Sequence, residues 1–336
     1  MLFPGTQTWK ALQGNRCRNK HDGFVKTIFL TPRRQERKNF SGDNNTLPLR
    51  TLRLRVTFRL STRPSNINNT KRKTVDAFFY SICFLFGAVV GSFLNVVILR
   101  LPDKEQSIAF PASHCPKCTT PIQWYDNIPM LSFLFLRGKC RACRAPISWQ
   151  YPLVELCMAA LSLSLYARFG LSFELFFYFI FLAGLLVIIF IDIQHQIIPD
   201  TISLPGIVLG FGGSFFNNQV SWQQSGLGVL IGGGLLYGIA LGYYLFTKRD
   251  GMGGGDIKLL AMIGAFLGWQ SLLFVGFASS LLGGIIGVCA MCQQKKGGQT
   301  RIPFGPFLAV AAISYLFFQH SILALWQAYL NSGGLS

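Results

Sequence analysis

The chain is short of charged residues, and of acidic ones above all. Charged side chains make up 13% of the 336 residues, and Asp and Glu together number 13. Hydrophobic residues reach 51%, and the mean hydropathy is +0.40. This composition excludes an ordinary soluble domain. Several apolar runs approach or exceed the ~20 residues that cross a bilayer, so we expect an all-α polytopic membrane protein.

Motifs of several common enzyme classes are also missing. No G-x-S-x-G, H-E-x-x-H or Walker pattern stands in a supporting context, which argues against a serine hydrolase, a zinc protease and an ATPase. A net charge of +18 would suit nucleic-acid binding. However, residues 1–74 hold 17 of the 31 Lys and Arg residues and only three acids, so the remaining 262 residues carry only +4. We therefore expect no binding to nucleic acid.

The basic residues 1–74 differ from the rest of the chain. They are rich in Arg, Asn and Thr, and they contain no sustained period and no long apolar run. We expect this segment to be disordered or weakly structured. A start codon assigned too far upstream would explain it equally well.

Apolar segments fill most of the chain after residue 74. They predict seven or eight transmembrane helices. The expected spans are residues 77–101, 153–169, 171–191, 197–216, 226–246, 257–291 (two segments that break near Gly268 and Trp269), 304–318 and a last segment near 321–330. We thus divide the chain into the basic segment 1–74, a first helix with a polar loop at 75–151, and a transmembrane domain at 152–330.

The polar loop between the first two spans contains four of the nine cysteines. They form Cys115-Pro-Lys-Cys118 and, after 21 intervening residues, Cys140-Arg-Ala-Cys143. Each pair places two sulfurs on a tight turn, and two such turns make the tetrahedral four-sulfur site of zinc ribbons. One or two disulfides are the alternative, although a reducing cytoplasm would favour a metal. His114 adjoins the first pair, but four thiolates complete the site without it.

Two acids stand beside apolar segments, where a charge is costly and indicates a functional site. Asp256 follows three glycines in Gly253-Gly-Gly-Asp256-Ile-Lys258, and Asp192 follows the apolar run 171–191. Two carboxylates that meet share a proton, so that one can activate water while the other protonates a leaving group. This chemistry suits cleavage of a peptide bond. The alternative for Asp256 is a helix cap after a flexible turn.

Three polar residues near these acids each have two interpretations. Asp200 follows Pro199 at the start of a new helix, whose N-terminus it can stabilise, so we favour Asp192 over Asp200 as the catalytic acid. His195 could tune the acids, but we expect it to face solvent. Lys258 either pairs with a lipid headgroup or lowers the pKa of one acid.

The charges of the loops predict the orientation in the membrane. The loops 102–151, 247–256 and 293–303 are basic, whereas the loop 217–225 has no charged residue. Basic loops remain in the cytoplasm. We therefore expect the cysteine loop, Asp192 and Asp256 on the cytoplasmic side.

Together these motifs resemble those of the type IV prepilin peptidases, which are bifunctional leader peptidase/N-methyltransferases. The segment from Gly91-Ser-Phe-Leu-Asn95 to Arg100-Leu-Pro102 is similar to the family's amino-terminal signature. The two C-x-x-C pairs resemble its zinc-binding loop. Asp192 with Ile198-Pro199-Asp200 resembles its first catalytic motif, and Gly253-Gly-Gly-Asp256 resembles its second, written G-x-G-D. Pro303-Phe-Gly-Pro306 also resembles the family, and the likeness runs from about residue 77 to 325.

The resemblance implies a specific activity. Asp192 and Asp256 would be the catalytic pair of an aspartic endopeptidase in the bacterial inner membrane, with Asp200 as a neighbour. The enzyme would cut the basic leader of prepilins and pseudopilins after a glycine on the cytoplasmic side. It would then methylate the new amino terminus with S-adenosylmethionine, for which Asn95 and Arg100 are candidate binding residues. Structural zinc on Cys115, Cys118, Cys140 and Cys143 would fold the loop.

Two other functions are compatible with the residues alone. A transporter could carry protons or cations on the two acids. Transport acids lie near the middle of the membrane, however, whereas Asp192 and Asp256 border polar loops. A membrane scaffold could bind a partner through the cysteine loop, but it would leave both acids unexplained. Membrane lipid is a partner under each hypothesis, and the sequence does not determine the oligomeric state.

Overall fold

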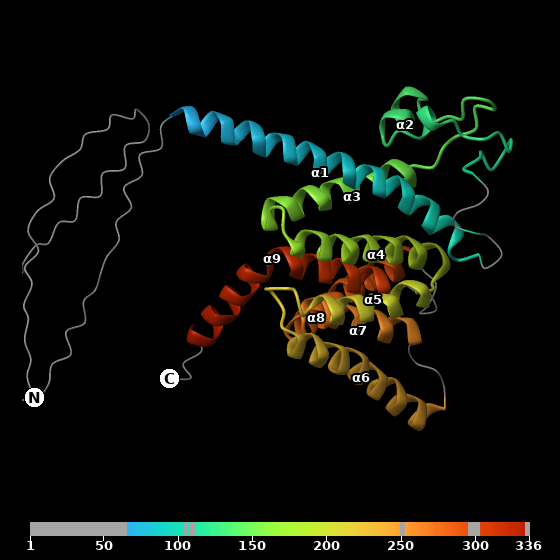
Figure 1. Ribbon diagram of the computed structural model, residues 1–336. Coiled ribbons are helices and arrows are strands. Elements are labelled where there is room, and N and C mark those ends of the chain that lie inside the picture. The colour runs from blue at the N-terminus through green and yellow to red at the C-terminus, as the bar shows by residue number, and fades with distance from the viewer. Residues whose placement is uncertain (1–65, 104–106, 108–111, 249–252, 295–302, 333–336) are drawn as a thin grey trace, which may run out of the picture. The chain divides into compact units, whose positions relative to one another are not determined.

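The computed structural model describes residues 66–103, 107, 112–248, 253–294 and 303–332 (Figure 1). Within these ranges the chain is helical with no β-strand, which confirms the expected fold class. The helices are α1 (Asn66–Arg100), η1 (Trp124–Asn127, a 3-10 helix), α2 (Leu131–Phe135), α3 (Gln150–Phe169), α4 (Phe173–His195), α5 (Asp200–Gly213), α6 (Trp222–Thr247), α7 (Gly254–Leu267), α8 (Trp269–Gln294) and α9 (Gly305–Ser332).

Six helices of the described chain are long and apolar enough to cross a bilayer, namely α1 from Thr74, α3, α4, α6, α8 and α9. Helices α5 and α7 are also apolar, but each has 14 residues. At 1.5 Å per residue this is about 21 Å, which is less than the ~30 Å of the hydrocarbon core. The segment expected near 321–330 is not separate, because it continues α9. The expected seven or eight spans thus correspond to six long helices and two short ones.

The start of α1 differs from the expectation for residues 1–74. Helix α1 begins at Asn66, whereas the apolar run begins only at residue 77. Residues 66–74 are therefore helical. The prediction for residues 1–65 lies outside the described residues. The same holds for several cations that carried the orientation argument, Lys104, Arg249, Lys295, Lys296 and Arg301.

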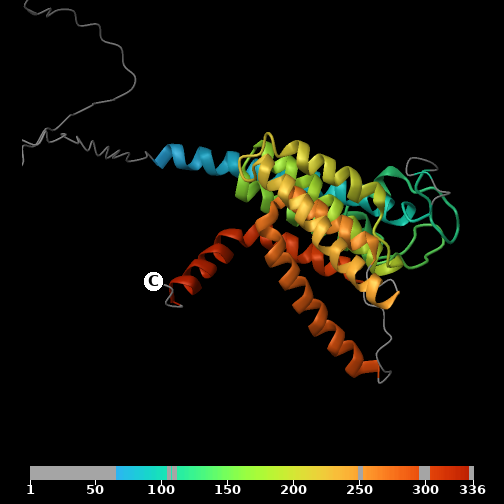
Figure 2. The same ribbon diagram turned by 90° about the horizontal axis from the view of Figure 1, so that it is seen from below.

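Helix α4 is the central element of the bundle. It packs against α1, α3, α5 and α9, and thirteen of its residues are buried. Figure 1 shows α1 and α3 on one side of α4, with α6 far from both. The short helix α7 is enclosed by α5, α6, α8 and α9, and its residues 259–267 are all buried. Figure 2 shows that the second half of α8 diverges from the other helices.

The ends of the helices follow local sequence signals. Ser221 and Gln224 form a capping box at the start of α6. Gly268 ends α7 with a φ of +78°. Glycine suits this position, because few other residues adopt this conformation easily. This confirms the expected break near Gly268 and Trp269. Pro199 precedes α5, which begins at Asp200.

Glycines allow the closest helix contacts of the bundle. A Cβ atom on Gly228 of α6 would overlap the carbonyl oxygen of Gly264 in α7, and the reverse is also true. Between α1 and α3, a Cβ atom on Gly91 would lie 2.7 Å from the Cα atom of Glu155. Small residues of this kind let helix backbones approach in a membrane, where packing replaces the hydrophobic effect between helices.

We predict that Gly228→Ala separates α6 from α7 and destabilises the protein by ~1–3 kcal/mol, the usual cost of overpacking. The matched control is Gly234→Ala on the same helix, because a Cβ atom there has no neighbour within 4 Å. Thermal unfolding in detergent should show a lower midpoint for Gly228→Ala only. Equal midpoints for the two variants would contradict the close contact.

Candidate active site and metal centre

Asp192 lies in the last turn of α4 with its side chain turned toward the start of α9. Only 5% of the residue is exposed. Its Oδ2 atom accepts a hydrogen bond of 3.0 Å from the backbone N–H of Gly305. A Cβ atom on residue 305 would stand 2.6 Å from the same oxygen, so this contact requires glycine. The helix N-terminus of α9 thus supplies a donor to a buried carboxylate.

Asp256 lies in the first turn of α7, which is not among the membrane-crossing helices. The residue is half-buried, and no side chain caps α7, so the helix-cap alternative for Asp256 is not observed. Burial and the charge of Asp192 together raise the pKa of Asp256 to about 6. The fold therefore places Asp192 within electrostatic range of Asp256.

Ile198, in the connection between α4 and α5, lies against the first residues of α7 and α9. A Cβ atom on Gly255 would lie 2.8 Å from the Cβ atom of Ile198, and one on Gly305 would lie 3.2 Å from its Cδ1 atom. The α4–α5 connection therefore packs directly against the starts of both α7 and α9. Two glycines make this possible, because larger residues would push either helix away.

Lys258 has a partner that neither sequence interpretation included. Its Nζ atom lies 2.7 and 2.8 Å from the two carboxylate oxygens of Asp200. This ion pair links the first turn of α5 to the second turn of α7. Asp200 is exposed, as an acid at a helix start is expected to be, and His195 is exposed as predicted.

The four loop cysteines come together as the sequence predicted. Their Sγ atoms all lie within 4.8 Å of one another, and no disulfide joins them. Cys115 Sγ and Cys143 Sγ are 3.8 Å apart. A regular tetrahedron of sulfurs at 2.3 Å from a metal has edges of about 3.8 Å. The cluster could therefore hold one metal ion, and His114 is not part of it.

The two C-x-x-C turns have the same backbone structure. The N–H of Cys115 donates to Thr120 O, and the N–H of Cys140 donates to Ala145 O. The residue after each second cysteine, Thr119 or Arg144, has a φ near +57°. Equivalent hydrogen bonds and turns place the two sulfur pairs in equivalent positions, so the backbone sets the arrangement of the four sulfurs.

Glu155 of α3 is a buried acid that the sequence analysis missed. Its Oε2 atom accepts a hydrogen bond of 2.7 Å from the N–H of Met130, and the Ser92 hydroxyl also bonds to this carboxylate. Met130 stands at the start of α2 with a φ of +58°, which is uncommon for a residue other than glycine. Glu155 therefore anchors the cysteine loop to α1 and α3. The signal was present, since Glu155 is a lone acid within an apolar run.

Asn95 and Arg100, the candidate methyl-donor residues, lie on the last turns of α1. The Asn95 amide donates to Gly91 O and to Tyr151 O of α3, while its Oδ1 atom is buried without a partner. Arg100 donates to Ser107 O. An orphaned buried acceptor can receive an amino or hydroxyl group, so Asn95 is compatible with a polar ligand. Its role stays a prediction.

Two family models match the chain. The bacterial peptidase A24 N-terminal domain matches residues 85–169, which contain α1, the cysteine loop and α3. The type IV leader peptidase family matches residues 179–288, which contain Asp192 and Asp256. No solved structure matches the chain significantly.

The curated relatives cover most of the chain. The prepilin leader peptidase/N-methyltransferase of Stutzerimonas stutzeri is 38% identical over 75% of this chain and 94% of the relative. Those of Aeromonas hydrophila and Pseudomonas aeruginosa are each 37% identical, over 73% and 76% of this chain and 92% and 95% of the relatives. The chain belongs to the prepilin leader peptidase/N-methyltransferase family.

We predict that the purified protein carries about one metal ion per chain on the four thiolates. Cys118→Ser and Cys140→Ser should each reduce this content strongly, as measured by elemental mass spectrometry. The control is Cys289→Ser, because Cys289 is an exposed residue of α8 outside the cluster. Unchanged metal content, or disulfides found by mass analysis without reduction, would contradict the metal site.

Proposed function

We propose that this protein cleaves the leader of prepilins and pseudopilins after a glycine and then methylates the new amino terminus with S-adenosylmethionine. The observation that supports the proposal most is the pairing of buried Asp192 with half-buried Asp256 at the ends of their helices. Family membership supports the same activity, since the relatives bear this name.

In our proposal the two acids act as one catalytic dyad. Asp192 Oδ2 accepts the Gly305 N–H, which fixes the orientation of its carboxylate, and we assign Asp192 as the base that activates water. Asp256, whose pKa is raised to about 6, is suited to hold the proton and give it to the leaving amine. The pair titrates as a unit because the two charges repel.

We place the dyad at the cytoplasmic boundary of the bacterial inner membrane. Asp192 ends α4, Asp256 begins α7, and Gly305 begins α9, so the dyad lies where helices meet loops. The cysteine loop follows α1 and precedes α3, and it carries the cations Lys117, Arg137, Lys139, Arg141 and Arg144. Such loops stay in the cytoplasm. This position admits the water that hydrolysis requires.

We assign structural zinc to the loop and S-adenosylmethionine to its junction with α1. Four thiolates in a tetrahedron are typical of Zn²⁺. Asn95 Oδ1 would accept a donor of the cofactor, and the Arg100 guanidinium suits its carboxylate. When bound, S-adenosylmethionine would supply the methyl group. Glu155 would keep the loop in register with these residues by holding Met130.

We predict that Asp192→Asn and Asp256→Asn each reduce prepilin cleavage by about 10²- to 10⁴-fold or more, because Asn cannot exchange a proton. Membranes with each variant would be incubated with a prepilin, and the products read by mass. Asp76→Asn is the control, since Asp76 is an exposed acid at the far end of α1.

A wild-type product that is one methyl group heavier would support the transferase. Active dyad variants would refute the assignment of the acids. A wild type that leaves the prepilin intact would favour the transporter or the scaffold instead.

We also predict that substitution of Asp200 and substitution of Lys258 shift the pH dependence of cleavage in opposite directions. The charge of Asp192 acts on Asp256, and Lys258, two residues beyond Asp256 on α7, is paired with Asp200 of α5. In Asp200→Asn the unpaired ammonium favours ionised Asp256 and lowers its pKa, so activity is lost at a lower pH. In Lys258→Met the unpaired Asp200 carboxylate raises this pKa, so activity extends to a higher pH.

Each shift should be a few tenths of a pH unit. The interaction energy of a half-exposed charge is less than ~1 kcal/mol, and one pKa unit is about 1.36 kcal/mol. The pH dependence of kcat/KM for cleavage measures both. Lys258→Arg keeps the charge and is the control. Shifts in the same direction would rule out this electrostatic balance.

A further inference from the structure

The short helix α2 of the cysteine loop has an exposed apolar side. Leu131, Leu134 and Phe135 are 51%, 72% and 80% exposed. They stand at positions i, i+3 and i+4, so they lie on one side of the helix. Ser132 is buried instead, and its hydroxyl donates to Tyr125 O at 3.0 Å. Helix α2 is therefore amphipathic, with its polar contact inside the loop and its apolar side outside.

Two contacts fix the position of α2 along the membrane-crossing helix α3. The ring centroids of Phe133 and Trp149 are 4.8 Å apart, and Trp149 directly precedes α3. The N–H of Met130, the residue before α2, donates to Oε2 of Glu155 in the second turn of α3. Helix α2 therefore lies beside the first two turns of α3.

The start of α3 lies at a boundary of the membrane. Helix α3 has 20 residues, and at 1.5 Å per residue it rises about 30 Å, which matches the thickness of the hydrocarbon core. Its two ends therefore lie at the two boundaries. Trp149 is 76% exposed at this level, and tryptophan is enriched where the membrane meets water. The contacts of α2 thus place it at the depth of the lipid headgroups.

Helix α2 also lies on the outer side of the bundle. Figure 1 shows α3 between α2 and α4. Phe133 turns toward Trp149, and Leu131 and Phe135, each two positions away, lie about 200° around the helix from it. These two side chains therefore point away from α3 and from the bundle, toward the surrounding lipid.

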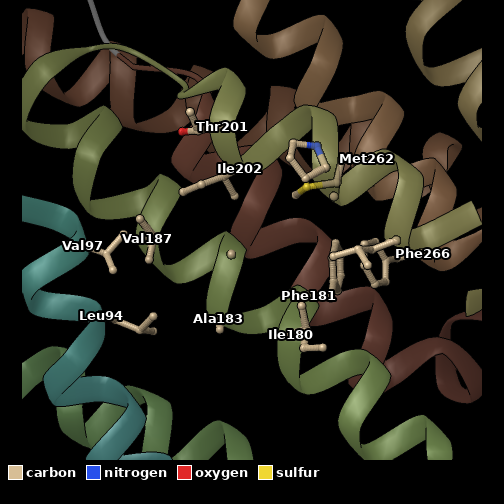
Figure 3. A pocket seen from close by; sticks show the side chains of 14 residues that line it. Leu94, Val97, Ile180, Phe181, Ala183, Val187, Thr201, Ile202, Met262 and Phe266 are labelled. Atoms are coloured by element: carbon tan, nitrogen blue, oxygen red, sulfur yellow. The ribbon is translucent and has the colours of Figure 1, made fainter. Parts of the chain in front are cut away.

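The cavity of the bundle does not receive the apolar side of α2. This cavity has a volume of about 270 Å³, and Figure 3 shows Leu94 and Val97 of α1 on one side of it. The other residues that line it come from α4, α5 and α7, and none comes from α2. Leu131, Leu134 and Phe135 therefore have no socket in this cavity.

The charges beside α2 suit phospholipid headgroups. Arg137 and Lys139 follow the helix, and both are exposed. Asp126 is the only acid in residues 112–149, and it is paired with Arg141, whose Nε atom lies 2.8 Å from its Oδ2 atom. Lipid phosphates would attract the two exposed cations, whereas the basic leader of a prepilin would be repelled by them. The charges therefore favour lipid over the leader as the partner of this surface.

We propose that α2 is an interfacial anchor that holds the cysteine loop in the surface of the phospholipid bilayer. Leu131, Leu134 and Phe135 enter the upper part of the acyl chains, as in amphipathic helices that lie in a membrane surface. Trp149 lies at the boundary with the headgroups, and the two cations after the helix bind lipid phosphate. The inference goes beyond the proposed function and does not depend on the assignment of the catalytic acids.

Quenching by spin-labelled lipid tests the depth of α2. A fluorescent amino acid would replace Phe135 in the full chain, which would be reconstituted in vesicles of phosphatidylethanolamine and phosphatidylglycerol. Part of the lipid would carry a nitroxide near the top of the acyl chain. We expect the nitroxide to quench this fluorophore at least threefold more than the same fluorophore at Lys117, an exposed polar position of the same loop. Iodide in the water should quench the two positions in the opposite order.

Two results would overturn the proposal. One is strong quenching by iodide at position 135 with no effect of the nitroxide, because the helix would then lie in water. The other is protection of position 135 from iodide only after a prepilin peptide is added, because the surface would then bind the substrate rather than lipid. A metal content equal to that of the wild type shows that the labelled loop is folded.

The double variant Arg137→Gln/Lys139→Gln tests the contact with the headgroups. It should lose at least half of the nitroxide quenching at position 135, because phosphate no longer holds the end of the helix. Lys117→Gln removes a cation elsewhere in the loop and should leave the quenching unchanged. Equal quenching in the double variant and this control would refute the role of the two cations. If the double variant loses its metal, the two single variants take its place.

Discussion

The structure depends on one hydrogen bond, from the N–H of Gly305 to the buried carboxylate of Asp192. A buried charge without a partner would cost several kcal/mol. The bond therefore requires α9 to begin beside the end of α4, although 113 residues separate the two positions. It also requires glycine at position 305, because a side chain would collide with the carboxylate. Ile198 then fixes α7 against the same point through Gly255, and α7 brings Asp256 with it.

The short helix α7 is the second consequence of this arrangement. It is too short to cross a membrane alone, and residues 259–267 are all buried by neighbouring helices. Gly228 and Gly264 allow α6 to contact its backbone directly. A helix enclosed in this way has little freedom to tilt, so the acid in its first turn keeps its position. The close glycine contact between α6 and α7 thus helps to hold Asp256 in its position.

Polar contacts join the described part of the cysteine loop and its neighbouring helices. Glu155 bonds to the strained Met130 backbone, and Asn95 bonds to the first turn of α3. Gln194, two residues after Asp192, bonds to Gln150 at the start of α3. These bonds connect α1, the end of α4 and the described part of the cysteine loop to α3.

The sequence by itself determined the features that are local. Apolar runs predict helices because burial of charge in lipid is costly, and the cysteine spacing predicts a metal site because two tight turns can each hold two sulfurs. It also identified Asp192 and Asp256 as unusual acids. Only the tertiary structure decided the partners of these residues. Gly305 as a donor, Asp200 as the partner of Lys258 and Glu155 as the loop anchor all arise from contacts between distant segments. No periodicity or spacing encodes such contacts, because they depend on which helices pack together.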